Sequence, residues 1–463
     1  VTLMKAITGW NFRPYSPMPQ EERSFSPYIC RLAPREGGFT ADFIDNGAPD
    51  GRHVFYWRRR GEGEWNAVSP DHDKEIFTVS VDCDDLTDYE IFAERLDDGK
   101  RSGIRLVRTG YVPGIVINYL HPDDNEYAFS GHYLCSPSLL KLQSGKLLAS
   151  MDVFAGDLAQ NLTLIYSSED DGKTWRYLTE LFPCFWGKLF LSDGKLYMLG
   201  VSREYGDLLI GRSDDEGKTW TVPTVLFRGS NFSPENGLHR APMPVCVSHG
   251  RVMTDVQYGS WAKFTFGDAV ISAPEHSDLL DARNWVSSGF WFPDDAPESK
   301  IKGVPGGIEG NVVVGPDGKV YDFLRYDNGV WLLLSFDPDE PEKKLKFEKL
   351  INLPATPSKT DILYDEKTRL YFAIVSYKLD EPRTGRNLLS LMCSEDLENW
   401  KLVRHLIDYR NEDPAKVAFQ YIDFRFDGDD IIYSSRTAFN GAKNYHDNNF
   451  QTFHRIENFR GLL

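Results

Sequence analysis

The sequence predicts an all-β protein, and three observations carry this prediction. No helical period of apolar residues is sustained along the 463 positions. Short apolar runs are instead separated by Gly, Asp and Asn turns. An acidic turn of the form S-x-D-x-G-x-T-W also occurs twice, at 168–175 and 213–220. The chain is therefore expected to consist of repeated antiparallel strands.

Each copy of the acidic turn follows an apolar run and ends in a tryptophan, Trp175 or Trp220. Its Ser and Asp side chains can bond the turn backbone, and its Gly can adopt a positive φ. A weaker third copy, 394–400, lacks the Gly. Because Asp is common at turns, Asp170 and Asp215 are expected to be structural. The motif predicts a hairpin turn within a repeated blade.

From about residue 130 onward, one pattern of strand, short Gly or Asp turn and second strand recurs six times. The period is roughly 50 to 70 residues, which a blade reaches when the loops on its binding face grow. The six hairpins predict a six-bladed β-propeller. They span residues 136–148, 187–197, 241–253, 310–321, 360–372 and 421–433.

The first part of the chain does not share this pattern. It contains alternating runs separated by Asp and Gly turns, which are typical of a small antiparallel β-sandwich. The segment Leu86-Thr87-Asp88-Tyr89 resembles the Tyr-bearing strand entry of fibronectin type III domains. We therefore expect a β-sandwich domain at 1–108, a linker or propeller-closing strand at 109–128, and the propeller at 129–463.

Composition limits the partners and the compartment. The formal net charge of -17 repels nucleic acid and anionic membranes. No apolar run reaches the ~18 to 20 residues of a membrane helix, and the first residues lack a signal-peptide apolar region. The six cysteines lie far apart without a C-x-x-C pair, which argues against a zinc site and a dense disulfide framework. We expect no metal or cofactor, and a cytoplasmic protein unless a leader has been trimmed.

In a propeller, the first strand of each blade starts at one rim of the central cavity, and the second strand ends there. Any one residue at these positions can have a structural role, in a turn ion pair or in blade packing. Convergence of many charged groups on one cavity nevertheless favours a site for a polar, ring-shaped ligand. The strand starts supply Cys135, Trp186, His239, Glu309, Lys359, Gln420 and Tyr421, and the strand ends supply Asp152, Arg203, Glu204, Tyr205, Tyr258, Arg325 and Arg436.

Residues 130 to 460 resemble the sialidase family of β-propellers, in which the acidic turn is called the Asp box or BNR repeat. Glu309 and Arg325 are similar to the family's strand-opening Glu and substrate-binding Arg. Tyr421-Ile422-Asp423-Phe424 resembles the segment with the nucleophile, and Asp152 resembles the acid/base Asp less specifically. The resemblance implies an exo-acting glycosidase in which Tyr421 is the nucleophile, Glu309 makes it more basic, and Asp152 is the acid/base.

One departure from the family bears on the substrate. Sialidases begin the first blade with an Arg that helps to bind the sugar carboxylate, whereas Cys135 stands at that position here. In the fifth blade the candidate cation is Lys359 rather than Arg. A triad reduced to Arg325, aided by Lys359, is poor for bidentate carboxylate recognition. We therefore expect a glycan other than a simple sialoside.

Two alternatives stay open. A uronate-specific polysaccharide lyase uses His or Tyr to abstract a proton and Arg or Lys to neutralise the carboxylate. A non-catalytic glycan-binding propeller is the second alternative. In every case the ligand is an oligosaccharide or polysaccharide, and the oligomeric state is left open. The lyase would use His239, Tyr205, Tyr258, Arg203 and Arg240, and the hydrolase would bind substrate through Trp186, Arg203, Tyr205, His239, Tyr258, Arg325, Lys359, Gln420 and Arg436.

Overall fold

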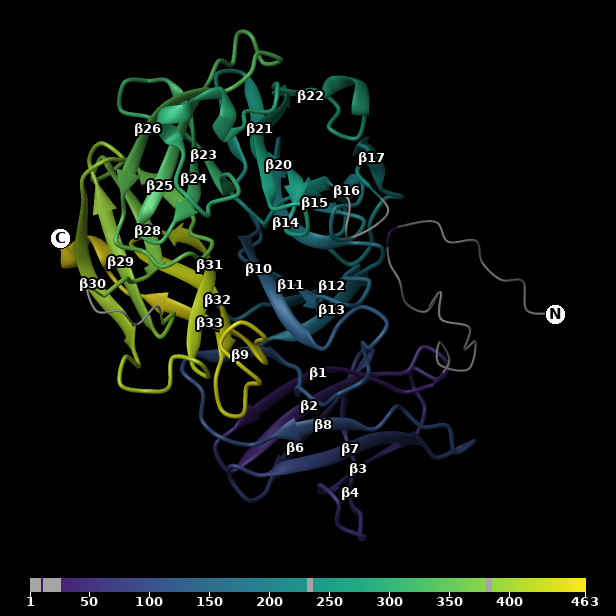
Figure 1. Cartoon of the computed structure of the whole chain (residues 1–463). Helices are drawn as coiled ribbons and strands as arrows, with labels where there is room; N and C mark the ends of the chain where they lie inside the picture. Colours follow the sequence, from purple (N-terminus) through teal and green to yellow (C-terminus); the bar gives the residue numbers. More distant parts are fainter. Residues whose placement is uncertain (1–9, 11–25, 231–235, 380–384) are drawn as a thin grey trace.

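The computed structural model describes residues 10, 26–230, 236–379 and 385–463 (Figure 1). Antiparallel strands in eight sheets make up almost all of their regular structure. No helix among these residues is long and apolar enough to cross a membrane. The all-β prediction is therefore confirmed. Helical structure in the described ranges is confined to 3-10 turns at Ala282–Asn284, Pro293–Asp295, Pro297–Ser299 and Phe459–Leu462.

Six of the sheets are blades that follow one another around a common centre (Figure 1). Their first strands are the inner ones: that of blade 1 contacts those of blades 2 and 6, and that of blade 4 contacts that of blade 5. Blade 1 contains β10 (Tyr133–Lys141), β11 (Leu147–Phe154), β12 (Leu162–Ser168) and β13 (Arg176–Leu181). Blade 2 contains β14 (Phe185–Ser192), β15 (Lys195–Val201), β16 (Leu208–Ser213) and β17 (Thr224–Phe227). Blade 3 contains β18 (Gly237–His239), β19 (Cys246–Ser248), β20 (Arg251–Ser260), β21 (Thr265–Pro274) and β22 (Val286–Ser287).

The last three blades complete the ring, so the prediction of six blades is confirmed. Blade 4 contains β23 (Ile308–Val314), β24 (Val320–Asp327), β25 (Val330–Phe336) and β26 (Lys346–Asn352). Blade 5 contains β27 (Ile362–Asp365), β28 (Leu370–Ser376), β29 (Leu388–Ser394) and β30 (Trp400–Asp408). Blade 6 contains β31 (Ala418–Asp427), β32 (Asp430–Ala438) and β33 (Phe450–Ile456), and its fourth strand is β9 (Ile115–Tyr119). Since β9 precedes blade 1 in sequence, the segment at 109–128 contributes a propeller-closing strand.

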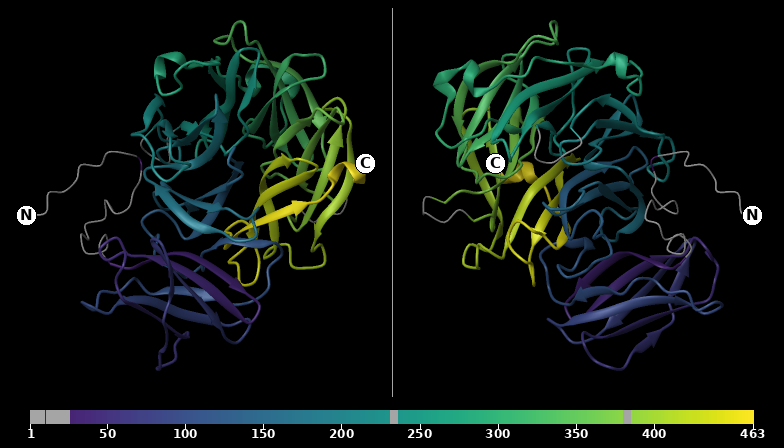
Figure 2. Two further views of the ribbon diagram at one scale, coloured as in Figure 1. Left: turned by 180° about the vertical axis from the view of Figure 1, so that it is seen from behind. Right: turned by 45° about the vertical axis from the view of Figure 1, so that its right-hand side comes forward.

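Two further sheets lie beside the propeller, in purple and blue (Figure 2). One has the order β1 (Tyr28–Arg35), β2 (Gly38–Ile44), β6 (Ile76–Asp82) and β5 (Asp71–Asp73), and the other has the order β4 (Asn66–Val68), β3 (His53–Arg59), β7 (Asp88–Arg95) and β8 (Arg105–Arg108). They share an apolar core that includes Phe39 and Phe55 and continues to Tyr119 of β9. The fibronectin type III-like assignment and the boundaries at 108 and 128 stay predictions.

The acidic turns are hairpins between the third and fourth strands of blades 1 and 2. In the first copy, Ser168 Oγ accepts a hydrogen bond from the Gly172 N–H at 2.9 Å, and Asp170 Oδ1 accepts one from the Thr174 N–H at 2.9 Å. Trp175 Nε1 donates to the Gly172 carbonyl at 3.1 Å. The copy at 213–220 repeats all three bonds. The carboxylates of these turns are thus engaged by their own backbone.

A β-bulge that recurs in four blades brings side chains to the central cavity. It falls where the register between the first and second strands shifts. At each bulge one non-glycine residue has a positive φ: 52° at Ser136, 53° at Trp186, 59° at Glu309 and 54° at Tyr421. Such a bulge bends the strand and re-aims a side chain. In blade 1 the position equivalent to Glu309 and Tyr421 is therefore Ser136, one residue after the predicted Cys135.

Candidate active site

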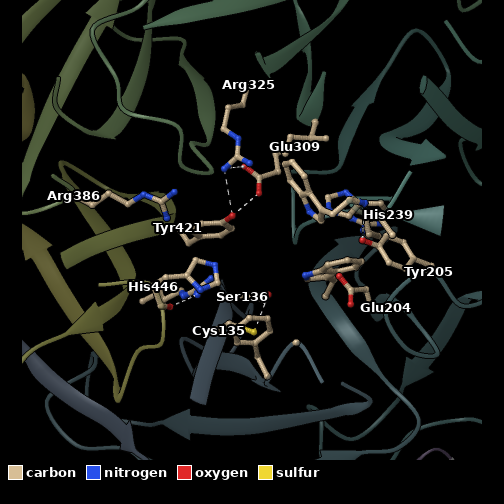
Figure 3. A pocket seen from close by; sticks show the side chains of 18 residues that line it. Cys135, Ser136, Glu204, Tyr205, His239, Glu309, Arg325, Arg386, Tyr421 and His446 are labelled. Atoms are coloured by element: carbon tan, nitrogen blue, oxygen red, sulfur yellow. Dashed lines mark hydrogen bonds and ion pairs between the residues drawn. The ribbon is translucent and has the colours of Figure 1, made fainter. Parts of the chain in front are cut away.

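A cavity of about 510 Å³ lies where the inner strands converge, and all six blades contribute to it (Figure 3). Most of its lining residues stand at the bulges, at the ends of second strands or in the loops that follow. The lining consists of Cys135, Ser136, Phe154, Gly156, Trp186, Glu204, Tyr205, His239, Arg240, Trp261, Ala262, Ile308, Glu309, Arg325, Arg386, Tyr421, Arg436 and His446.

Tyr421, Glu309 and Arg325 form one contact group in this cavity. Tyr421 Oη donates a hydrogen bond to Glu309 Oε1 at 2.7 Å. Arg325 Nη1 lies 3.0 Å from Glu309 Oε2 and 3.4 Å from Tyr421 Oη. Burial, followed by the charge of Glu309, raises the pKa of Tyr421, while the nearby arginines act in the opposite direction. The phenol is thus held against a base that can accept its proton, and a guanidinium is close enough to stabilise the resulting charges.

Two more arginines flank the ring of Tyr421. The guanidinium carbons of Arg436 and Arg386 lie 4.8 Å and 5.9 Å from its centroid. Neutral groups hold both side chains: Arg436 Nε donates to Asn448 Oδ1 at 2.6 Å, and Arg386 donates to Gln420 Oε1. Within the described ranges, neither guanidinium forms an ion pair. This side of the cavity therefore carries positive charge that suits an anionic ligand.

Aromatic and neutral groups line the opposite side (Figure 3). The rings of Trp186 and His239 lie 4.5 Å apart, and those of Tyr205 and His239 lie 6.3 Å apart and are stacked. Burial lowers the pKa of His239 to about 4, so its imidazole is neutral at pH 7. Glu204 also lies here, and burial raises the pKa of its carboxyl. The cavity thus has a cationic wall and a largely aromatic wall.

Of the twelve residues predicted to be catalytic or substrate-binding, seven line the cavity and five do not. Those that line it are Trp186, Tyr205, His239, Glu309, Arg325, Tyr421 and Arg436. Arg203 and Tyr258, placed at second-strand ends, lie outside the lining. The Tyr258 ring packs on Phe290 at 5.7 Å and is 37% exposed. Strand ends therefore mark the rim but do not determine which side chains turn inward.

Asp152 lies behind the wall, which corrects its assignment as the acid/base residue. It is fully buried and is not part of the cavity lining. One carboxyl oxygen accepts a hydrogen bond from the Trp186 N–H at 2.7 Å, and the other accepts one from the Thr163 hydroxyl. Burial raises the pKa of Asp152 to about 7. Asp152 joins blade 1 to the bulge of blade 2, so it positions Trp186 without reaching a ligand.

Lys359 and Gln420 also have structural partners instead of facing the cavity. Lys359 Nζ donates to Asp361 Oδ1 and to the Ile422 carbonyl, and the side chain is fully buried. The charge of Lys359 is therefore neutralised by a buried ion pair with Asp361. Gln420 Nε2 donates to the Tyr445 carbonyl at 2.6 Å while its oxygen accepts from Arg386. Gln420 thus holds Arg386 in place.

Several cavity residues were missed because they stand outside the two strand positions used for prediction. Arg386 precedes β29, His446 lies between β32 and β33, and Trp261 lies between β20 and β21. No repeated sequence signal marks these loops. The sequence around His446 has no spacing that suggests a metal site. In the described ranges, no group of three or more His, Cys, Asp or Glu residues forms a metal site.

Comparison with known proteins gives structural similarity only. No family model and no curated protein sequence matches the chain. Among solved structures, the Penicillium chrysogenum α-L-arabinanase bound to arabinobiose is 14% identical, with 76% of this chain and 99% of that chain covered and a TM-score of 0.47. A leech intramolecular trans-sialidase bound to 2,7-anhydro-Neu5Ac is 10% identical, with coverages of 93% and 91% and a TM-score of 0.49. The intramolecular trans-sialidase of Ruminococcus gnavus is 13% identical, with coverages of 74% and 96% and a TM-score of 0.46.

Proposed function

We propose that this protein is an exo-acting, sialidase-like glycoside hydrolase that cleaves a terminal sugar carrying a carboxylate. The observation that carries the proposal is the contact of Tyr421 with Glu309 at 2.7 Å, with Arg325 against both. A tyrosine nucleophile paired with a carboxylate base is one of the known exceptions to the two-carboxylate scheme of glycoside hydrolysis. The exo-acting mode is what the resemblance to sialidases implies for a cavity of about 510 Å³ at the propeller centre.

The contacts support a double displacement. Glu309 accepts the phenolic proton as Tyr421 Oη attacks the anomeric carbon and the bond to the leaving oxygen breaks. Water then attacks the same carbon, the bond to Tyr421 breaks, and Glu309 returns the proton to the phenolate. Arg325 holds the Glu309 carboxylate in place and stabilises charge on the phenol oxygen. The product sugar therefore keeps its anomeric configuration.

The cationic wall supports an anionic sugar. Arg325, Arg386 and Arg436 surround the tyrosine, and the last two are held by neutral partners. Burial lowers the pKa of Arg386 to about 10, because desolvation of its charge is costly. A substrate carboxylate would relieve this cost through charge-assisted hydrogen bonds. The expectation of a non-sialoside substrate counted only Arg325 and Lys359, so the proposal extends to carboxylated sugars in general, sialosides included.

A panel of aryl glycosides tests this function. We expect the aryl sialoside or the aryl glucuronide to be hydrolysed, and the neutral aryl arabinofuranoside and the methyl ester of the active substrate to react poorly. Arg386→Ala should raise KM for the carboxylated substrate about 10- to 100-fold, since a hydrogen bond to a charged group contributes about 1.5 to 3 kcal/mol. Arg410→Ala, which removes an exposed arginine paired with Asp408, serves as the control.

Three results would overturn the proposal. Turnover of the neutral arabinofuranoside at the rate of the carboxylated substrate would remove the role of the arginines. A product that absorbs near ~235 nm would indicate β-elimination by a lyase, with His239 or a tyrosine as the base. Binding of glycans without turnover of any substrate would indicate a binding propeller.

A further inference from the structure

We propose that Glu204 is the acid/base residue of this site, protonating the leaving oxygen and later deprotonating the attacking water. The inference rests on the proposed hydrolase function. Only two carboxyl groups belong to the described lining of the cavity, Glu204 and Glu309. Glu309 is occupied by Tyr421 and Arg325. Glu204 is therefore the lining carboxyl that remains for proton transfer to the leaving group.

The surroundings of Glu204 fix its orientation. Gln160 Nε2 donates a hydrogen bond to Glu204 Oε2 at 2.6 Å, and Gln160 is itself buried with a φ of 51°. The next residue, Tyr205, has a φ of 61°, and its hydroxyl accepts a bond from the Trp261 N–H at 3.2 Å. Two non-glycine residues with positive φ in adjacent loops indicate backbone held by its packing, as is common at functional sites. The carboxyl of Glu204 is thus held in place by the packing and hydrogen bonds of its neighbours.

The burial of Glu204 favours the protonated form of its carboxyl. Burial has the largest influence on its carboxyl and raises its pKa, whereas Gln160, Tyr205 and Arg203 favour the ionised form. The Cys135 thiol, on the neighbouring blade, also lines the cavity, and the charge of Glu204 helps to raise its pKa. Because a carboxyl with a raised pKa is protonated below that pKa, the acid role is present at low pH and is lost as pH rises through it.

The cavity separates the two reacting groups. Glu204 stands in the loop that follows the second strand of blade 2, and Tyr421 stands at the bulge of blade 6. Figure 3 shows them on opposite sides of the cavity, with Ser136 and Cys135 below the gap. In the first step, the proton of Glu204 goes to the leaving oxygen as Tyr421 Oη attacks. In the second step, Glu204 accepts a proton from the water that attacks the anomeric carbon, which restores both groups.

The test compares leaving groups in wild-type protein and in Glu204→Gln. We expect kcat/KM of the variant to fall about 10²- to 10⁴-fold for an alkyl glycoside, the range of general-acid catalysis, and to change less than tenfold for a dinitrophenyl glycoside that needs no protonation. The fall of activity at high pH should disappear in the variant. Azide should restore turnover of the dinitrophenyl substrate and release the glycosyl azide with retained configuration.

Two aspartates serve as controls. Asp157 follows the lining residue Gly156 in the sequence, and Asp152 is buried behind the wall of the cavity. Asp157→Asn and Asp152→Asn should show no dependence of their rate loss on the leaving group. The assignment would be overturned if kcat/KM of Glu204→Gln fell equally for every leaving group or did not fall at all. It would also be overturned if the rate loss of Asp157→Asn depended on the leaving group.

A measurement without substrate keeps this test separate from that of the function. Infrared titration should show a protonated carboxyl band that persists above the pH at which an ordinary Glu ionises, near 4.3. Buried carboxyls such as Asp152 also hold a proton in this range, so the band of Glu204 is taken from the difference between the spectra of wild type and Glu204→Gln. If the Glu204 band is present but the wild-type protein hydrolyses no glycoside, the hydrolase function is rejected while the raised pKa of Glu204 is retained. An ordinary titration of Glu204 would reject the acid role even if the protein hydrolyses glycosides.

Discussion

At the scale of single residues, the role of a side chain here follows from its partners more than from its type. Asp152, which is buried, and Glu204, which is half-buried, are both carboxyls near the cavity with raised pKa values. Asp152 accepts a backbone hydrogen bond from the neighbouring blade, whereas Glu204 lines the cavity. The sequence indicated both residues as strand-end carboxylates, but it carried no signal for which one turns inward. That difference depends on a bulge and a loop that the residue types do not specify.

A substitution at Asp152 tests its structural role. Its pKa of about 7 in the folded protein exceeds the ~3.9 of an unfolded Asp, so its contribution to stability is fully present below pH ~4 and is lost as pH rises through 7. Asp152→Asn removes this dependence. The free energy of unfolding of the variant relative to wild type should therefore increase between pH 4 and pH 7.5, by at most about 4 kcal/mol at 1.36 kcal/mol per pKa unit.

Denaturant unfolding across this pH range measures the difference. Asp337→Asn, at an exposed position, is the matched control and should show no pH-dependent difference from wild type. If the unfolding free energies of Asp152→Asn and wild type ran parallel from pH 4 to pH 7.5, Asp152 would already be ionised at neutral pH in the folded protein.

At the scale of elements, the hairpins were predictable because their turn residues repeat, whereas the bulges were not. The Ser, Asp, Gly and Trp of the acidic turn each make a bond that their chemistry requires. The four bulge residues Ser136, Trp186, Glu309 and Tyr421 share a backbone conformation but no side-chain type. A conformation imposed by register and by the neighbouring blade leaves no residue pattern to recognise.

Trp175 tests the energetic role of the acidic turn. Its side chain is 1% exposed, and its ring lies 5.5 Å from that of Phe453 in blade 6. Trp175→Ala should lower the free energy of unfolding by roughly 3 to 5 kcal/mol, since it opens a cavity between two blades. Trp400 makes the same Nε1 bond to a turn carbonyl but is only half-buried. A loss in Trp400→Ala as large as in Trp175→Ala would show that the turn bond, and not burial, is responsible.

At the scale of the whole molecule, the number of blades followed from six repeated hairpins, but the composition of the cavity did not. The propeller closes through β9, which pairs with β33 across more than 300 positions of sequence. Arg386 lines the cavity from a loop, whereas Lys359 does not line it and forms an ion pair with Asp361. Both outcomes depend on how blades meet at the axis, and short-range patterns contain no information on that contact.

The central claim is that Tyr421 becomes covalently attached to the sugar. The most direct measurement is mass spectrometry of peptides after the protein has reacted with a fluorinated carboxylated glycosyl fluoride, which forms the intermediate but hydrolyses slowly. We predict a glycosylated peptide with the sugar on Tyr421 and no adduct in Tyr421→Phe. An adduct on Glu309 or Glu204, or full activity of Tyr421→Phe, would contradict the claim.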